Sequence, residues 1–137
     1  MKQHSTNYTN TFIEVAEDCP VSHAQVPPDK KEKTLANLQY EKISNHPYQY
    51  SSDDIVFDGY AFKNDISENE KQKVREQFFS KGQACLRSSP LAKRYGFGFH
   101  HNKEGKVAIF PVESEEYQKF LNDPHIAKTK AMRSKRK

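Results

Sequence analysis

Residues 97–112, FGFHHNKEGKVAIFPV, decide the fold class because they predict a β-hairpin. The two arms, Phe97 to His101 and Lys106 to Val112, are strand-like, and the turn-forming residues Asn102-Lys103-Glu104-Gly105 separate them. Another strand is expected at Phe12 to Ala16, which is rich in aromatic and β-branched residues and ends before Pro20. The proline-containing segment from about 20 to 33 is expected to be an exposed loop.

Helix signals surround these strands. Four segments begin after a hydroxyl side chain that is suited to cap a helix, and each is followed by a residue that ends one. The expected helices are Thr34 to Asn45, a helix from the capping box Ser67-Glu68-Asn69-Glu70 to Gly82, a short turn from Ser89-Pro90 to Gly96, and Ser114 to Asn122.

Residues 54–63 are expected to form a strand, because their apolar side chains fall on both faces of an extended chain. Such a strand lies in the middle of the sheet with cover on each side, or has a helix on one face and another partner on the other. Together these elements predict a single compact α+β domain, in which a small mixed or antiparallel sheet of about four strands packs with three to four helices. We expect a flexible N-terminus at 1–10, the domain at 11–124 and a flexible basic C-terminal tail at 125–137.

Length and cysteine content limit the class of protein. A chain of 137 residues is the size of one ordinary domain. Cys19 and Cys85 are far apart and lack CxxC spacing, which favours two reduced thiols over a disulfide. The polar stretch Met1 to Thr11 lacks the apolar core of a secretory signal, and no segment is apolar over the roughly 18 residues that span a bilayer. We therefore expect a soluble, cytoplasmic protein without a membrane partner.

The positive charge of the chain is concentrated at its end. The net charge is +4, but six of the 22 basic residues lie in the last ten positions, and the rest of the chain carries 16 basic and 18 acidic residues. The six are Lys128, Lys130, Arg133, Lys135, Arg136 and Lys137. Such a tail either binds nucleic acid phosphates without sequence preference or is simply solvated, and we favour the solvated tail.

Four segments resemble a known family. They are Asn10 to Pro20 (NTFIEVAEDCP), Tyr48 to Asp54 (YQYSSDD), Arg75 to Gln83 (REQFFSKGQ) and Leu86 to Gly96 (LRSSPLAKRYG). They are similar to the landmark segments of a small, uncharacterised, mainly bacterial family known only as a domain of unknown function, number 6157. The resemblance covers residues 10 to about 121, leaves out the basic tail, and implies no activity, cofactor or catalytic residue.

Polar residues are densest between Cys85 and His101. The hydroxyls of Ser88 and Ser89 precede a helical turn, where free backbone amides can hold a phosphate or carboxylate beside a guanidinium. We therefore expect a candidate anion site there, against the alternative of an ordinary helix cap beside solvated cations. The candidate residues are Arg87, Ser88, Ser89, Lys93, Arg94, His100 and His101.

Other chemistry has weaker support in the sequence. His100 and His101 are adjacent in an expected strand, so they should point to opposite faces and not share a metal ion. Cys85 has no motif of a catalytic nucleophile, and a buried structural thiol is the favoured interpretation. No GxSxG or phosphate-binding glycine motif is present. We expect no cofactor, no metal site and no catalytic signature.

Three functions follow from these observations. We favour a non-catalytic domain that binds an anionic small molecule or a protein partner. The first alternative is a small enzyme that uses the Arg87 to His101 region, with one histidine titrating abnormally beside the cations. The second is non-specific nucleic-acid binding through the basic tail, which would be steeply salt-dependent.

Overall fold

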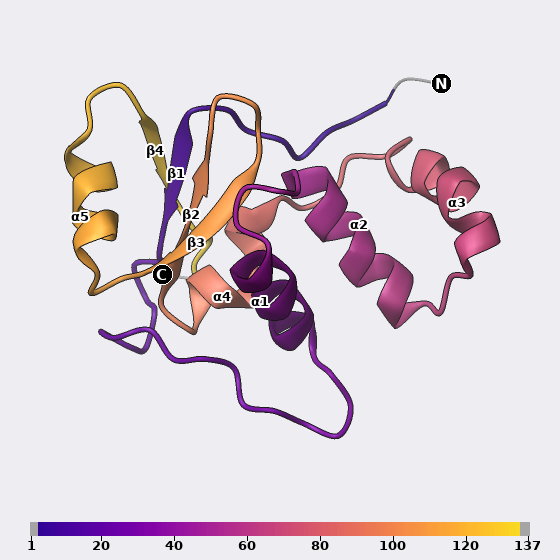
Figure 1. Cartoon of the computed structure of the whole chain (residues 1–137), viewed down its shortest axis with the longest axis horizontal. Coiled ribbons are helices and arrows are strands. Elements are labelled where there is room, and N and C mark those ends of the chain that lie inside the picture. Colours follow the sequence, from indigo (N-terminus) through magenta and orange to yellow (C-terminus); the bar gives the residue numbers. More distant parts are fainter. Residues whose placement is uncertain (1–2, 135–137) are drawn as a thin grey trace.

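The hairpin expected at residues 97–112 forms half of the sheet in the computed structural model, which describes residues 3–134 (Figure 1). Within this range, one four-stranded sheet has the order β3-β2-β1-β4. β2 (Phe97–His101) pairs antiparallel with β3 (Val107–Pro111) and with β1 (Thr11–Glu14), and β1 pairs parallel with β4 (Ala127–Lys130). The mixed sheet and its helices confirm the predicted α+β class.

Helices cover both faces of the sheet. Over the described residues these are α1 (Leu35–Asn45), α2 (Ser52–Lys63), α3 (Lys71–Phe78), α4 (Pro90–Lys93) and α5 (Glu115–Asn122). Ile13 and Phe99 point into the main core, toward Ile43 of α1 and Ile55 of α2. Phe12 lies on the other face, against Tyr117 of α5 at a ring-centroid distance of 4.8 Å. Figure 1 shows α5 apart from the other helices, across the sheet.

Gly98 allows α5 to pack closely on the sheet. A Cβ atom at this position would lie 2.6 Å from Cζ of Phe12 and 2.7 Å from Cε2 of Tyr117. Both contacts are too short for any side chain to be added without moving the rings. The absence of a side chain at Gly98 therefore fixes the distance between α5 and the centre of the sheet.

Residues 54–63 are helical, so the strand predicted there is wrong. Ser51 begins α2 with a capping box, in which its hydroxyl accepts from the amide of Asp54 and the Asp54 carboxylate accepts from the amide of Ser51. Ile55 faces the main core, whereas Phe57 and Ala61 pack with Phe79 in a second apolar cluster. The apolar residues on both sides of this segment thus reflect a helix buried between two clusters.

The other helix predictions have mixed outcomes. Thr34 and Ser89 cap α1 and α4 as predicted. The Ser67 hydroxyl instead donates to the Glu70 carboxylate at 3.0 Å and caps no backbone amide, so the predicted capping box is wrong. A short 3₁₀ turn at Glu68–Glu70 leads into α3, which ends at Phe78 and not at Gly82.

Both chain ends contact the rest of the domain within residues 3–134, and the flexibility expected of them stays a prediction. In the N-terminal segment, the buried Thr6 donates its amide and its hydroxyl to the Asp53 carboxylate, at 2.6 and 2.8 Å. At the other end, residues 127–130 form β4, whose backbone pairing with β1 continues to a hydrogen bond from the amide of Ala131 to Glu14 at 2.8 Å. Backbone hydrogen bonds between strands do not require alternating apolar side chains, so the lysine-rich residues 127–130 do not indicate a strand. Lys135, Arg136 and Lys137 lie outside the described residues.

None of the helices within residues 3–134 is long and apolar enough to cross a membrane.

Candidate functional site

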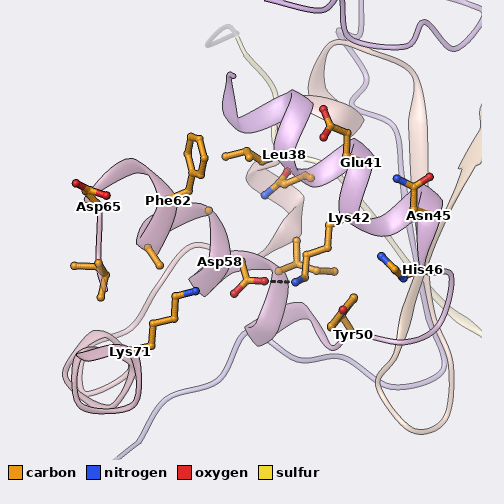
Figure 2. A pocket seen from close by; sticks show the side chains of 15 residues that line it. Leu38, Glu41, Lys42, Asn45, His46, Tyr50, Asp58, Phe62, Asp65 and Lys71 are labelled. Atoms are coloured by element: carbon orange, nitrogen blue, oxygen red, sulfur yellow. Dashed lines mark ion pairs between the residues drawn. The ribbon is translucent and has the colours of Figure 1, made fainter. Parts of the chain in front are cut away.

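A cleft of about 640 Å³ lies between α1, α2 and the start of α3 (Figure 2). α1 and α2 cross closely at Gly59, where a Cβ atom would lie 2.7 Å from Cδ1 of Leu35. Lys71, the first residue of α3, also lines the cleft. The apolar part of the lining is Leu38, Ile55, Ala61, Phe62 and Ile66.

Phe62 is the most accessible of these apolar side chains. It is 55% exposed, whereas Ile55 and Ala61 of the same helix are buried. Figure 2 shows its ring at the edge of the cleft, on the same side as Leu38. An exposed ring beside a hollow offers contact area that the fold itself does not use.

Charged groups of both signs line the same cleft. Lys42 of α1 forms an ion pair with Asp58 of α2, and its ammonium group lies 3.8 Å from the centroid of the Tyr50 ring. Lys71 of α3 pairs with Glu68 at 2.6 Å, and this hydrogen bond raises the pKa of Lys71. Figure 2 shows the Lys71 ammonium pointing toward Asp58.

The charges therefore alternate from one helix to the next, with Asp58 between the ammonium groups of Lys42 and Lys71. Glu41 and Asp65 add two carboxylates to the lining, so three acidic and two basic side chains border the cleft. Glu41 is paired with Lys33, which lies outside the lining. The cleft can thus offer both hydrogen-bond donors and acceptors beside an apolar wall.

A second hollow of about 320 Å³ lies on the other side of the α1–α2 crossing. Gln39 and Gly59 border both hollows. Cys85, Ser88 and Ser89 line the second one, and Lys63 is its only charged lining residue within the described part of the chain. Two of the seven residues predicted from sequence to bind an anion therefore do border a hollow.

Those two serines already have partners. The Ser89 hydroxyl is buried, donates to Oε1 of Gln39 at 2.5 Å and accepts from the amide of Leu91 as the cap of α4. The Ser88 hydroxyl donates to the sulfur of Met132 at 3.3 Å. Ser89 thus acts as the helix cap that was the alternative interpretation of this residue.

The predicted cations Arg87, Lys93 and Arg94 line neither hollow. Nε of Arg87 donates to the backbone carbonyl of Lys130 at 2.7 Å, which fastens the C-terminal strand. Lys93 ends α4 and Arg94 follows it.

The two histidines lie on opposite faces of β2, as the strand geometry predicts. His100 stacks on Phe120 of α5 at 4.2 Å and shares a 2.8 Å hydrogen bond with the Tyr48 hydroxyl. Burial lowers the pKa of His100. His101 is fully buried on the other face, where the Tyr8 ring meets it edge-on at 5.3 Å.

Within residues 3–134, neither ring nitrogen of His101 makes a hydrogen bond of ordinary geometry, although backbone groups of Thr11 and Phe99 lie close enough to favour the protonated ring slightly. Burial lowers its pKa to about 4, so the ring is neutral at pH 7. The Tyr8 hydroxyl in turn contacts the Cys85 sulfur at 3.3 Å, and burial together with this contact raises the pKa of Tyr8 to about 12. His101 borders neither hollow, and we interpret it as part of the core.

Residues 3–134 contain no group of three or more His, Cys, Asp or Glu side chains arranged to hold a metal ion. The cysteines are not bonded to each other.

The sequence interpretation missed the cleft because it placed residues 54–63 in a strand. A strand at this position gave no reason to expect Asp58 and Phe62 beside Lys42, which lies on a separate helix. The available signal was Ser51-Ser52-Asp53-Asp54, a hydroxyl followed three residues later by an acid, which starts a helix. With that helix in place, the i, i+3 and i+7 spacing of Ile55, Asp58 and Phe62 predicts one shared face.

One comparison with known proteins gave a match. A family model described as a family of unknown function, DUF6157, matches residues 3–137. This confirms the resemblance found in the sequence and extends it over the basic C-terminal segment. Neither the curated proteins nor the solved structures gave a match.

Proposed function

Since this chain belongs to the DUF6157 family of unknown function, its role has to be inferred from its own residues, and we propose that it is a non-catalytic domain that binds a small molecule in the cleft between α1, α2 and α3. The observation that carries the proposal is the cleft itself. Its volume of about 640 Å³ falls within the usual range of roughly 300–1,000 Å³ for small-molecule sites. Apolar walls with a few polar groups are the usual lining of such sites.

The enzyme alternative requires a cation and a histidine of the Arg87 to His101 region to line one cavity. His100 and His101 lie on opposite faces of the sheet, and Arg87 holds the backbone of Lys130. Arg87, His100 and His101 line neither of the two hollows, which favours binding over catalysis as the proposal.

The nucleic-acid alternative depends on free positive charge near the C-terminus. Lys130 and Arg133 approach the Glu17 carboxylate at 3.6 and 3.8 Å, which offsets part of that charge. Ending the chain at Ser134 would test this alternative without removing β4. Retained DNA affinity would exclude the last three residues as its cause.

A cytoplasmic location is part of the proposal. The two unpaired cysteines agree with a reducing compartment. Cell fractionation of the tagged full-length protein tests it, and recovery in an exported fraction would refute it.

A thermal-shift screen of small metabolites tests the proposed binding site. A compound present at about 100 times its dissociation constant stabilises the fold by roughly 2.7 kcal/mol, which moves the melting temperature by several degrees. Phe62→Ser should abolish the shift, because it removes the exposed ring at the cleft edge.

The matched control is Val26→Ser, which changes an equally exposed apolar residue outside the cleft; Val26 is 58% and Phe62 is 55% exposed. A shift that Phe62→Ser leaves intact but Lys63→Ala removes would place the ligand in the second hollow. That result, or no shift with any compound, would refute the proposal.

A further inference from the structure

The charges in the cleft favour one class of ligand. We propose that the cleft binds a small zwitterion with an apolar body, the chemistry of a free apolar amino acid, with its carboxylate near Lys42 and Lys71 and its ammonium near the acidic side chains. This inference rests on the proposed function, because it names the ligand of the same cleft.

A purely anionic ligand fits the cleft poorly. Three carboxylates and two ammonium groups border the cleft, so an anionic ligand would enter surroundings of net negative charge. Each lysine also has an acid of the chain as its partner, Asp58 for Lys42 and Glu68 for Lys71. A ligand carboxylate that binds the lysines displaces their acidic partners. Its binding is most favourable when the same ligand carries a positive charge that pairs with the displaced acids.

A purely cationic ligand fits poorly for a different reason. The Tyr50 ring is one aromatic face that would attract a cation, and the Lys42 ammonium already occupies it at 3.8 Å from the ring centroid. A ligand ammonium that binds Asp58 displaces Lys42, and an anionic group on the same ligand can replace the lost partner of that lysine.

The partial exposure of the Lys42–Asp58 ion pair allows ligand groups to replace the contacts within the pair. The side chains of Lys42 and Asp58 are 25% and 41% exposed, so both retain contact with solvent. Ligand groups can replace the water at these side chains without breaking a fully buried pair, which would cost several kcal/mol. The apolar residues Leu38, Ile55 and Phe62 lie beside the charges and can receive the apolar body.

Calorimetric titration of the full chain with matched compounds tests the inference. The probes are L-phenylalanine, 2-phenylethylamine and 3-phenylpropanoate, which share an apolar body but carry both charges, the ammonium alone or the carboxylate alone. A parallel series uses L-leucine, isopentylamine and 4-methylpentanoate. A zwitterion should bind about ten-fold or more tightly than either partner of its series, as expected for the loss of a hydrogen bond to a charged group.

Lys71→Ala should remove most of the zwitterion's advantage over the amine, because it weakens the zwitterion and the carboxylate alike, while Lys71→Arg should preserve it. The control is Lys73→Ala, an exposed position two residues along α3 that does not line the cleft. Circular dichroism confirms that each variant is folded.

The outcomes separate this inference from the proposed function. If the amine or the acid binds as tightly as the zwitterion, in a manner that depends on Phe62, the cleft is a binding site but the zwitterion inference is wrong. If no compound of either series binds while other metabolites bind in a Phe62-dependent manner, the inference is again wrong. If no compound of any class binds the cleft, both proposals fail.

Discussion

Lys42 and Asp58 form an ion pair across the crossing of α1 and α2, and this contact joins the two helices that open into the cleft. Both side chains of the pair are partly exposed, so the contribution of the pair to the free energy of unfolding is modest, on the order of 0.5–1 kcal/mol. Its position matters more, because it places opposite charges between the two helices that line the cleft.

Asp58→Asn should therefore change binding more than folding. The free energy of unfolding, measured by urea denaturation at pH 7, should fall by no more than about 1 kcal/mol. Any cleft ligand with an ammonium group should lose affinity by roughly ten-fold. Asp29→Asn, in the exposed loop before α1, is the control and should change neither quantity. A variant that fails to fold would contradict the assignment of this pair to the site.

Gly98→Ala should destabilise the protein by about 1–3 kcal/mol, since the added methyl group overlaps the rings of Phe12 and Tyr117 and lies 3.0 Å from the carbonyl oxygen of Ile13. Gly82→Ala is the matched control, because a Cβ atom there meets nothing within 4 Å. It should be neutral or slightly stabilising. Equal losses for the two variants would contradict the packing of α5 against β2.

The two serine caps can be compared directly. The Ser51 hydroxyl accepts from the amide of Asp54, so Ser51→Ala should cost about 1 kcal/mol. The Ser67 hydroxyl bonds only the Glu70 carboxylate, and Ser67→Ala should change stability by a few tenths of a kcal/mol at most. Urea denaturation of both variants measures the difference. A larger loss at Ser67 would reverse the assignment of the two caps.

His101 should make the fold sensitive to mild acid. Its pKa is lowered from 6.5 to about 4 in the folded protein, so the unfolded chain takes up a proton first as the pH falls. The stabilisation is complete above about pH 6.5 and is lost as the pH falls toward 4. From pH 7 to 4.5 the fold should lose roughly 2 kcal/mol through this residue.

His101→Phe should flatten the dependence of unfolding free energy on pH over that range, whatever its effect at pH 7. His100 contributes in the same direction, since burial also lowers its pKa, so some dependence should remain. His125→Gln, at an exposed position, is the control. An unchanged slope in His101→Phe would show that this ring is not the buried neutral group described here.

Local signals in the sequence predicted three of the four strands and four of the five helices within residues 3–134, with α3 shorter than predicted. The hairpin turn at Asn102 to Gly105 and the caps at Thr34, Ser89 and Ser114 depend on neighbouring residues only, and the structure contains all of them. These features could be predicted because their hydrogen bonds join residues within a few positions of each other.

The errors came from features that depend on distant parts of the chain. The apolar residues of α2 face two separate clusters, a pattern that a buried strand also gives. β4 is held by backbone hydrogen bonds to β1, more than 100 residues earlier in the sequence, and its side chains reveal nothing of them. The cleft was missed with α2, because Lys42, Asp58 and Lys71 come from three different helices.

The most direct test of the central claim is an NMR titration of the ¹⁵N-labelled full chain with the best compound from the thermal-shift screen. Binding in the cleft predicts amide shift changes concentrated at the residues of α1, α2 and α3 around Lys42, Asp58, Phe62 and Lys71, and their loss in Phe62→Ser. Shift changes centred on Cys85 to Ser89, on the His100 face of the sheet or on the C-terminal residues would contradict it.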